Sequence, residues 1–204
     1  MAEVKLTTPI TEEQVRKLKV GDIIYVNGTI FLARDEAHLR ALEYAEQGKK
    51  MPLDFKGLAL FHCGPICTKD AKGEWQVIAA GPTTSSRMEL FEDKFIEKFR
   101  ISVVIGKGGM FEKTTEAMKK FGAVYVSFTG GAGVLAAKAV KKVKGVEWLD
   151  LGTPEALWIF EVENFGPLIV GIDSHGNNLF KKLDEEVAKN KLKAYEIIGI
   201  EKPK

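Results

Sequence analysis

The segment ISVVIGKGGM at residues 101–110 joins a short apolar run to a glycine-rich loop, and a helical pattern continues from it to Lys120. Its β-branched residues predict a buried strand, and its glycines predict a loop that other atoms can approach closely. The same order of strand, loop and helix recurs at 124–142 and at 168–190. Three such units favour an α/β fold.

The first half of the chain is richer in strand patterns. Strands are predicted at 21–26 and 29–33, with a hairpin turn at Asn27-Gly28 between them, because both turn residues tolerate a positive φ. A helix should then run from a cap at Asp35 to a stop at Gly48. Further elements are predicted as buried strands at 58–61, 75–80 and 156–162, a polar turn at 68–73 and a helix at 89–99.

The composition is that of a packed protein. The 204 residues are 45% hydrophobic and 28% charged, and no repeat or linker divides them, so we expect one domain over 1–204. The net charge of +2 is too small to suggest a nucleic-acid or membrane-surface binder. No apolar run approaches the roughly 20 residues that span a bilayer, and the first residues lack a signal-peptide pattern. We therefore expect a cytoplasmic protein.

Metal ligands are scarce in this sequence. Cys63 and Cys67 are the two cysteines, and there are three histidines. Two thiols cannot form a disulfide framework or a four-thiolate metal site. The spacing of the pair is also poor for zinc, so we expect two buried or half-buried thiols and no metal bound by this chain alone.

The stretch GPTTSSRM at 81–88 lies between a predicted strand and a predicted helix. Its hydroxyls and the free amides of a helix start could bind an anion, and Arg87 could form two parallel hydrogen bonds with a carboxylate. The structural alternative is a helix cap formed by the threonines and serines. In the loop GKGGM at 106–110, Lys107 supplies a point charge, but the Walker pattern is absent.

Three other stretches allow a functional and a structural interpretation. The pattern GAGVLA at 131–136, with Asp150 about twenty residues on, fits a dinucleotide fold, although small residues also let a helix pack closely on a sheet. Arg34 ends a predicted strand and could face a ligand or lie at the surface. The letters Asp-Ser-His at 173–175 belong to a hydrolase triad, but adjacent residues do not converge. Asn177 or Asn178 is expected to cap the last helix.

Taken together, these stretches resemble the β subunit of the class I iron–sulfur fumarate hydratase and L(+)-tartrate dehydratase family. The resemblance implies a swivelling β/β/α domain, the C-terminal domain of single-chain members of the family. It covers nearly the whole chain and rests on segments in the family order: 33–38, 62–65, 81–88, 106–110, 165–168 and 175–178.

The resemblance implies a hydro-lyase that adds water to, or removes it from, a four-carbon dicarboxylate. In the family, three cysteines of a separate α subunit hold a [4Fe-4S] cluster, so this chain would be active only with that partner, as a dimer of αβ heterodimers. Hydration of fumarate to malate is the expected reaction. L(+)-tartrate dehydration is the nearest alternative, because Ser85-Ser86 stand where single-chain fumarate hydratases tend to have Ala-Gly.

The resemblance also implies roles for single residues. Arg34, Arg87 and Lys107 would bind the two substrate carboxylates, with Thr84 beside them. Thr83 would transfer the proton, with Thr84 or a partner residue as alternatives, and positive charge such as that of Arg87 would have to stabilise the deprotonated alcohol. Two other function classes stay open: a dinucleotide-binding protein that uses 131–136, and a non-catalytic assembly subunit.

Overall fold

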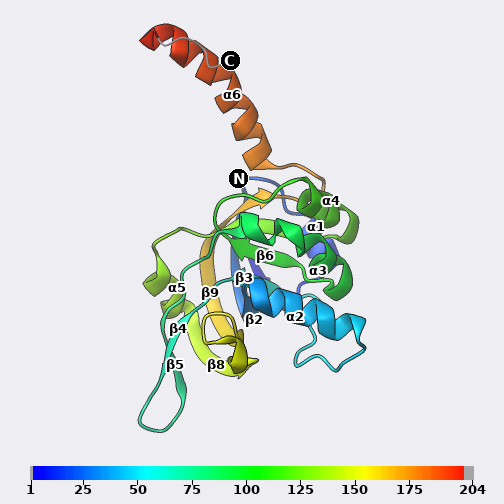
Figure 1. Ribbon diagram of the computed structural model, residues 1–204, viewed down its shortest axis with the longest axis vertical. Coiled ribbons are helices and arrows are strands. Elements are labelled where there is room, and N and C mark those ends of the chain that lie inside the picture. The colour runs from blue at the N-terminus through cyan, green and yellow to red at the C-terminus, as the bar shows by residue number, and fades with distance from the viewer. Residues whose placement is uncertain (1, 200–204) are drawn as a thin grey trace.

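The computed structural model describes residues 2–199 as one α/β unit built on a mixed sheet (Figure 1). The strands are β1 (Glu3–Thr7), β2 (Ile23–Ala33), β3 (Ala59–His62), β4 (Ile66–Lys69), β5 (Trp75–Ala79), β6 (Val103–Gly106), β7 (Val124–Ser127), β8 (Val140–Glu147) and β9 (Leu157–Ile172). The helices are α1 (Glu12–Arg16), α2 (Asp35–Glu46), α3 (Glu92–Phe99), α4 (Glu112–Phe121), α5 (Gly133–Ala139) and α6 (Leu179–Ile198), with the 3₁₀ turns η1 (Ser85–Leu90) and η2 (Leu149–Leu151).

The main sheet has the strand order β1-β2-β3-β6-β7-β9-β8, and β9 also pairs with β2. Strands β1, β2, β3, β6 and β7 pair in parallel, whereas β9 runs antiparallel to β2, β7 and β8. The second pairing of β9 closes the sheet on itself. Because the central strands are parallel, the loops after β2, β3 and β6 meet at one edge of the sheet, which we call the carboxyl edge.

Alternation along the strands separates two apolar cores. On β2, Ile30 and Leu32 face the core inside the closed sheet, whereas Phe31 and Ala33 face the core beneath the helices. Helices α2, α3 and α4 cover this outer core on one side of the sheet (Figure 1). The side chain of Tyr125 on β7 also points outward into it. Each large side chain buried in this way stabilises the fold by about 1.5–3 kcal/mol.

The predicted hairpin at Asn27-Gly28 is wrong. The chain continues through both residues as one strand, β2, and its register against β9 shifts on either side of Val26. Gly28 has a φ of +91°, and a Cβ there would lie 2.6 Å from Thr8 Oγ1. Glycine is therefore required here because the strand bulges and the Thr8 segment packs against it, and not because the chain reverses.

The cap predicted at Asp35 is also wrong, although the helix is present. Arg34 occupies the N-cap position without a side-chain capping bond, and Asp35 is the first helical residue. The carboxylate of Asp35 accepts a hydrogen bond from Arg87 instead. Gly48, with a φ of +64°, lies just beyond the end of α2 as predicted.

Three further predictions differ from the structure. Helix α5 ends at Ala139, and the lysine-rich segment after it forms β8, because Val143 and Val146 pack against the inner core while neighbouring lysines are exposed. The strand predicted at 156–162 and the strand that opens the predicted unit at 168–190 are parts of the single strand β9. The strand at 75–79 pairs with β4 in a separate two-stranded sheet and is only partly buried.

Helix α6 projects away from the body of the protein (Figure 1). Asn178 caps it as predicted, because its side chain accepts hydrogen bonds from the amides of Phe180 and Lys181. In the described part of the chain, no helix combines the length and apolar character needed to cross a bilayer. The swivelling motion implied by the family resemblance stays a prediction.

Candidate active site

The residues singled out at 81–88 and at 106–110 lie together at the carboxyl edge. Thr84 forms an isolated parallel bridge with Lys107, and the amide of Ser85 donates to the carbonyl of Lys107 at 3.1 Å. The backbone amide of Thr83 donates to the carbonyl of His62 at the end of β3, at 2.7 Å. The turn that carries both threonines is therefore fixed by backbone bonds to two neighbouring loops.

Arg87 connects this turn to the start of α2. Its Nη2 donates to Asp35 Oδ2 at 2.8 Å and to Thr83 Oγ1 at 3.4 Å. The Arg87 side chain is 48% exposed and that of Asp35 is 32% exposed. A solvent-exposed ion pair of this kind contributes about 0–1 kcal/mol, so a ligand carboxylate can replace Asp35 at little cost.

Arg34 lies at the same edge and is paired with a second carboxylate. Its Nε is 3.1 Å from Glu155 Oε1. Gly64 lets the arginine pass, because a Cβ there would lie 2.9 Å from Arg34 Cδ and 2.5 Å from the carbonyl oxygen of Pro154. The Arg34 side chain is thus largely enclosed by its neighbours, with 27% of it exposed, and its Nε is buried without a hydrogen bond among the described residues.

Lys107 differs from the two arginines, because within residues 2–199 no carboxylate lies within 4 Å of its ammonium group. Its side chain runs beside the next loop, where a Cβ at Gly130 would lie 3.6 Å from Lys107 Cδ. Three cations therefore lie on the loops at this edge, and Arg34 and Arg87 are each paired with a carboxylate.

The helix-cap interpretation of the threonines is wrong. Thr84 precedes η1 at the N-cap position, but its side chain forms no capping hydrogen bond. Thr83 lies one residue before Thr84, and its hydroxyl accepts a hydrogen bond from Arg87. The Thr84 side chain is exposed and that of Thr83 is half-buried. Neither hydroxyl therefore caps the turn η1.

The glycine pattern at 131–136 serves packing. The amide of Ala80 donates to the carbonyl of Gly133 at 3.0 Å, and a Cβ at Gly133 would lie 3.2 Å from the amide nitrogen of Gly81. The strand that follows α5 pairs antiparallel with β9, so the parallel βαβ unit of a dinucleotide fold is absent here. Asp150 forms an ion pair with Arg40 at 2.7 Å. These contacts argue against the dinucleotide hypothesis.

A buried group that sequence patterns did not reveal lies beneath the threonine turn. Glu92 Oε2 is 3.0 Å from His62 Nε2 and 3.5 Å from His38 Nε2, and all three side chains are fully buried. Burial by itself would raise the pKa of Glu92, but the charge and hydrogen bonds of the two histidines hold it at about 2. Burial lowers the pKa of His62. No local pattern marks Glu92, because α3 also contains the acidic residues Asp93 and Glu97.

The thiols do not suit an iron–sulfur cluster on this chain. Cys63 is buried and Cys67 is half-buried, as predicted, and both are free. Burial raises the pKa of both thiols, that of Cys67 to about 11, so they stay protonated near neutral pH. The group of His38, His62 and Glu92 has donor atoms within 4.8 Å of one another, but it offers no thiolate.

Comparison with known proteins identifies the relatives of this chain. A model of the family described as fumarase C-terminus matches residues 1–183. A protein of Escherichia coli K12 named "L(+)-tartrate dehydratase subunit beta" is 47% identical over 184 residues, which cover 89% of this chain and 90% of that protein. A protein of Methanocaldococcus jannaschii named "Putative L(+)-tartrate dehydratase subunit beta" is 44% identical, with 94% and 96% covered.

A longer relative matches with only part of its length. The protein of Geobacillus stearothermophilus named "Putative fumarate hydratase class I" is 43% identical over 182 residues. The match covers 89% of this chain but 34% of that protein. About two thirds of the longer protein therefore have no counterpart in this sequence.

Proposed function

Because the chain belongs to the fumarase C-terminus family, we propose that it is the β subunit of a two-subunit hydro-lyase acting on a four-carbon dicarboxylate. Fumarate, hydrated to malate, and L(+)-tartrate, which is dehydrated, are the two candidate substrates, and the names of the relatives support both. The observation that carries the proposal is the hydroxyl of Thr83 bonded to Arg87, beside Lys107, at an edge where three loops meet.

In this proposal the cations bind the substrate. Arg34, Arg87 and Lys107 hold the two carboxylates, and the dianion takes the place of Asp35 and Glu155 at the two guanidinium groups. Fixing both ends of the substrate aligns the bonds that break. Cations already in place also stabilise the additional negative charge that develops when a proton leaves carbon.

Thr83 transfers the proton in this proposal. An alcohol is a weak base near neutral pH, so its deprotonated form needs positive charge and a hydrogen-bond donor beside it. Arg87 Nη2 supplies both at 3.4 Å from Thr83 Oγ1. Thr84 is the alternative, because it lies on the same turn with an exposed side chain.

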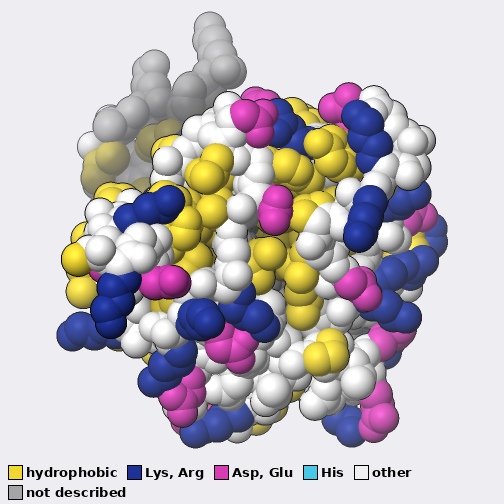
Figure 2. Space-filling model, turned by 90° about the horizontal axis from the view of Figure 1, so that it is seen from below, with side chains coloured by type: hydrophobic (Ala, Val, Ile, Leu, Met, Phe, Trp, Pro, Cys, Tyr) yellow, Lys and Arg dark blue, Asp and Glu magenta, His cyan; other side chains and the backbone are white. Residues whose placement is uncertain are grey.

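The proposal includes a partner α subunit that carries a [4Fe-4S] cluster, in a cytoplasmic dimer of αβ heterodimers. Exposed apolar side chains occur within six residues of the site loops: Leu39 after Arg34, Ile66 after His62, Leu90 after Arg87 and Val134 after Gly130. Hydrophobic side chains also gather between lysines and arginines on the end of the molecule opposite α6 (Figure 2). A partner corresponding to the unmatched part of the Geobacillus protein would cover such apolar surface.

The test is co-expression with the product of the neighbouring open reading frame under anaerobic conditions. Hydration of fumarate and dehydration of L(+)-tartrate are then measured for the complex and for each chain alone. We expect turnover of at least one substrate by the complex and none by this chain alone. Full activity of the partner alone would instead support a non-catalytic assembly subunit.

A further inference from the structure

The buried side chains beneath the candidate active site form a continuous polar network. It begins at Glu92, whose Oε2 lies 3.0 Å from His62 Nε2. On the other side of the ring, His62 Nδ1 lies 3.0 Å from Ser85 Oγ. The side chains of Glu92 and His62 are fully buried, and Ser85 is 0% exposed. The proposed reaction uses none of these groups.

His62 fixes the threonine turn at two points. Its carbonyl accepts from the amide of Thr83 at 2.7 Å, and its ring binds the hydroxyl of Ser85. The two bonds lie on either side of Thr84. A shift of the ring therefore moves the backbone that carries both candidate proton-transfer hydroxyls.

Ser85 also connects the network to the loop of Lys107. Its amide donates to the Lys107 carbonyl, and its hydroxyl lies 3.2 Å from the hydroxyl of Tyr125. Tyr125 also donates to the carbonyl of Gly108 at 3.1 Å, and burial raises its pKa, so the phenol keeps its proton. A Cβ at Gly106 would overlap Ser85 Oγ, which shows how closely the two loops pack.

His38 connects the same carboxylate to Arg34. Its Nδ1 lies 2.7 Å from the Arg34 carbonyl, which can only accept, so Nδ1 carries a proton. Its Nε2 has no full hydrogen bond among the described residues and faces Glu92 Oε2 at 3.5 Å.

The order of carboxylate, imidazole and hydroxyl also occurs in hydrolase triads. In this protein Ser85 is sealed beneath the loop of Gly106, so its hydroxyl cannot attack a substrate. What the arrangement does provide is a link between the loops, through the contacts of the His62 ring with Glu92 and Ser85. Glu92 Oε1 and His38 Nε2 have no hydrogen bond among the described residues.

We propose that Glu92, His62 and Ser85 are positioning residues, which hold the loops of Arg34, Thr83 and Lys107 as one unit. This inference rests on the proposed hydro-lyase function, since the three loops supply its substrate-binding and proton-transfer groups. Misplacing such groups by about 1 Å lowers turnover roughly a hundredfold. The network residues therefore affect turnover without touching the substrate.

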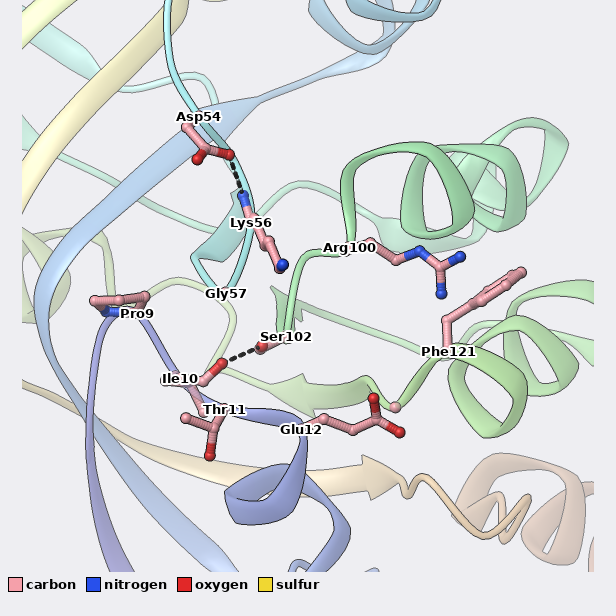
Figure 3. Close-up of a pocket in the computed structure, with 11 residues that line it drawn as sticks. Pro9, Ile10, Thr11, Glu12, Asp54, Lys56, Gly57, Arg100, Ser102 and Phe121 are labelled. Carbon is pink, nitrogen blue, oxygen red and sulfur yellow. Dashed lines mark hydrogen bonds between the residues drawn. The ribbon is translucent and has the colours of Figure 1, made fainter.

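The test compares two buried serines in the αβ complex. Ser85→Ala breaks the network, and Ser102→Ala removes a buried hydroxyl bonded to the Ile10 carbonyl at 2.7 Å, at the opposite edge of the sheet (Figure 3). We expect Ser85→Ala to lower kcat about ten- to a hundredfold with a smaller change in KM, at a temperature where both variants are folded. Equal kcat values for the two variants would overturn the inference.

A second comparison uses Tyr125→Phe alone and combined with Ser85→Ala. The network requires that the effects of the two changes on Tm and kcat are not additive, because both remove the same connection. Additive effects contradict it. If the wild-type complex turns over neither fumarate nor L(+)-tartrate, the proposed function fails, while additivity in Tm still tests the network independently.

Discussion

The two edges of the parallel strands carry similar residue types in different arrangements. The amino edge has a hollow of about 700 Å³ among the loops that precede β3, β6 and β7 (Figure 3). There the guanidinium of Arg100 lies 4.2 Å from the ring centre of Phe121, and Ser102 bonds to the Ile10 carbonyl. At the carboxyl edge Arg87 donates a hydrogen bond to the hydroxyl of Thr83, and the carboxylate of Glu92 is buried beneath this turn.

The comparison teaches that a hollow by itself does not make a site. At the amino edge the arginine and the serine are used up in packing and in a backbone bond. At the carboxyl edge Arg34 and Arg87 pair with partly exposed carboxylates, and buried polar contacts join the loops from below. Ligands of α/β sheets bind outside the carboxyl ends of the parallel strands, and the site that we propose lies at that edge, whereas the hollow of Figure 3 lies at the other.

The largest effect is expected from the buried layer. Glu92→Ala leaves two buried histidines without their carboxylate and should lower the free energy of unfolding by about 3–5 kcal/mol. Ser102→Ala, which removes a single neutral hydrogen bond, should cost about 1 kcal/mol. Urea unfolding of the chain measures both. Equal losses of unfolding free energy in the two variants would mean that the buried groups at the two edges stabilise the fold equally.

The same carboxylate sets the response to pH. The pKa of Glu92, about 2, is below its ordinary value of 4.5, so its stabilisation is complete above about pH 4.5 and is lost as the pH falls toward 2. The lowered pKa of His62 acts in the same direction below its ordinary value of 6.5. Stability should therefore fall on acidification, and less steeply in Glu92→Gln, as thermal unfolding from pH 7 to pH 3 would show.

The next effect concerns the arginines. Arg87→Ala should lower kcat of the αβ complex about 10²- to 10³-fold, because a fixed donor at the developing charge is lost. The control is Arg100→Asn at the amino edge, since asparagine tolerates the left-handed backbone of Arg100, with its φ of +53°. Steady-state kinetics on both variants measures the two kcat values. An equal loss of kcat in the two variants would contradict a role of Arg87 in the site.

A smaller effect is expected for the lysine. Lys107→Ala removes the one site cation that has no carboxylate within 4 Å in the described range, so KM should rise about tenfold, the equivalent of 1.4 kcal/mol of binding. Lys56→Ala in the hollow of the amino edge is the matched control and should leave KM unchanged. An unchanged KM in Lys107→Ala would contradict its role in binding the dicarboxylate.

The smallest effect is expected for Asp35, and it is a fall in KM where the lysine variant should show a rise. Asp35→Asn removes a carboxylate that competes with the substrate for Arg87, and a surface pair is worth about 0–1 kcal/mol. KM should therefore fall by up to about fivefold, with stability unchanged. A higher KM would show that Asp35 positions Arg87 instead of competing for it.

Local sequence patterns predicted the parts of the molecule that depend on neighbours along the chain. The strand, loop and helix around Lys107 are present, and the resemblance placed Arg87, Thr83 and Lys107 in segments that do meet. The pattern at Asn27-Gly28 misled, because contact with Thr8 and pairing with β9 decide its conformation. No local pattern could bring together groups that are far apart in the chain.

The buried network illustrates this most clearly. His38, His62 and Glu92 come from three elements, and His38 and Glu92 lie in helices that contain several other charged residues. Only the closed sheet and its packed helices bring their side chains to one point. Sequence patterns can therefore identify the exposed groups of such a site more readily than the buried groups that orient them.

The closing strand β9 has a consequence for synthesis. Its pairing with β2 joins Ile23 to Ile169, so the edge of β2 stays open until almost the whole domain has been translated. Contacts between residues so far apart in the sequence form slowly. A strand edge that stays unpaired in the meantime favours aggregation. On the growing chain, the side of β2 that pairs with β9 therefore stays without its partner until β9 has been synthesised.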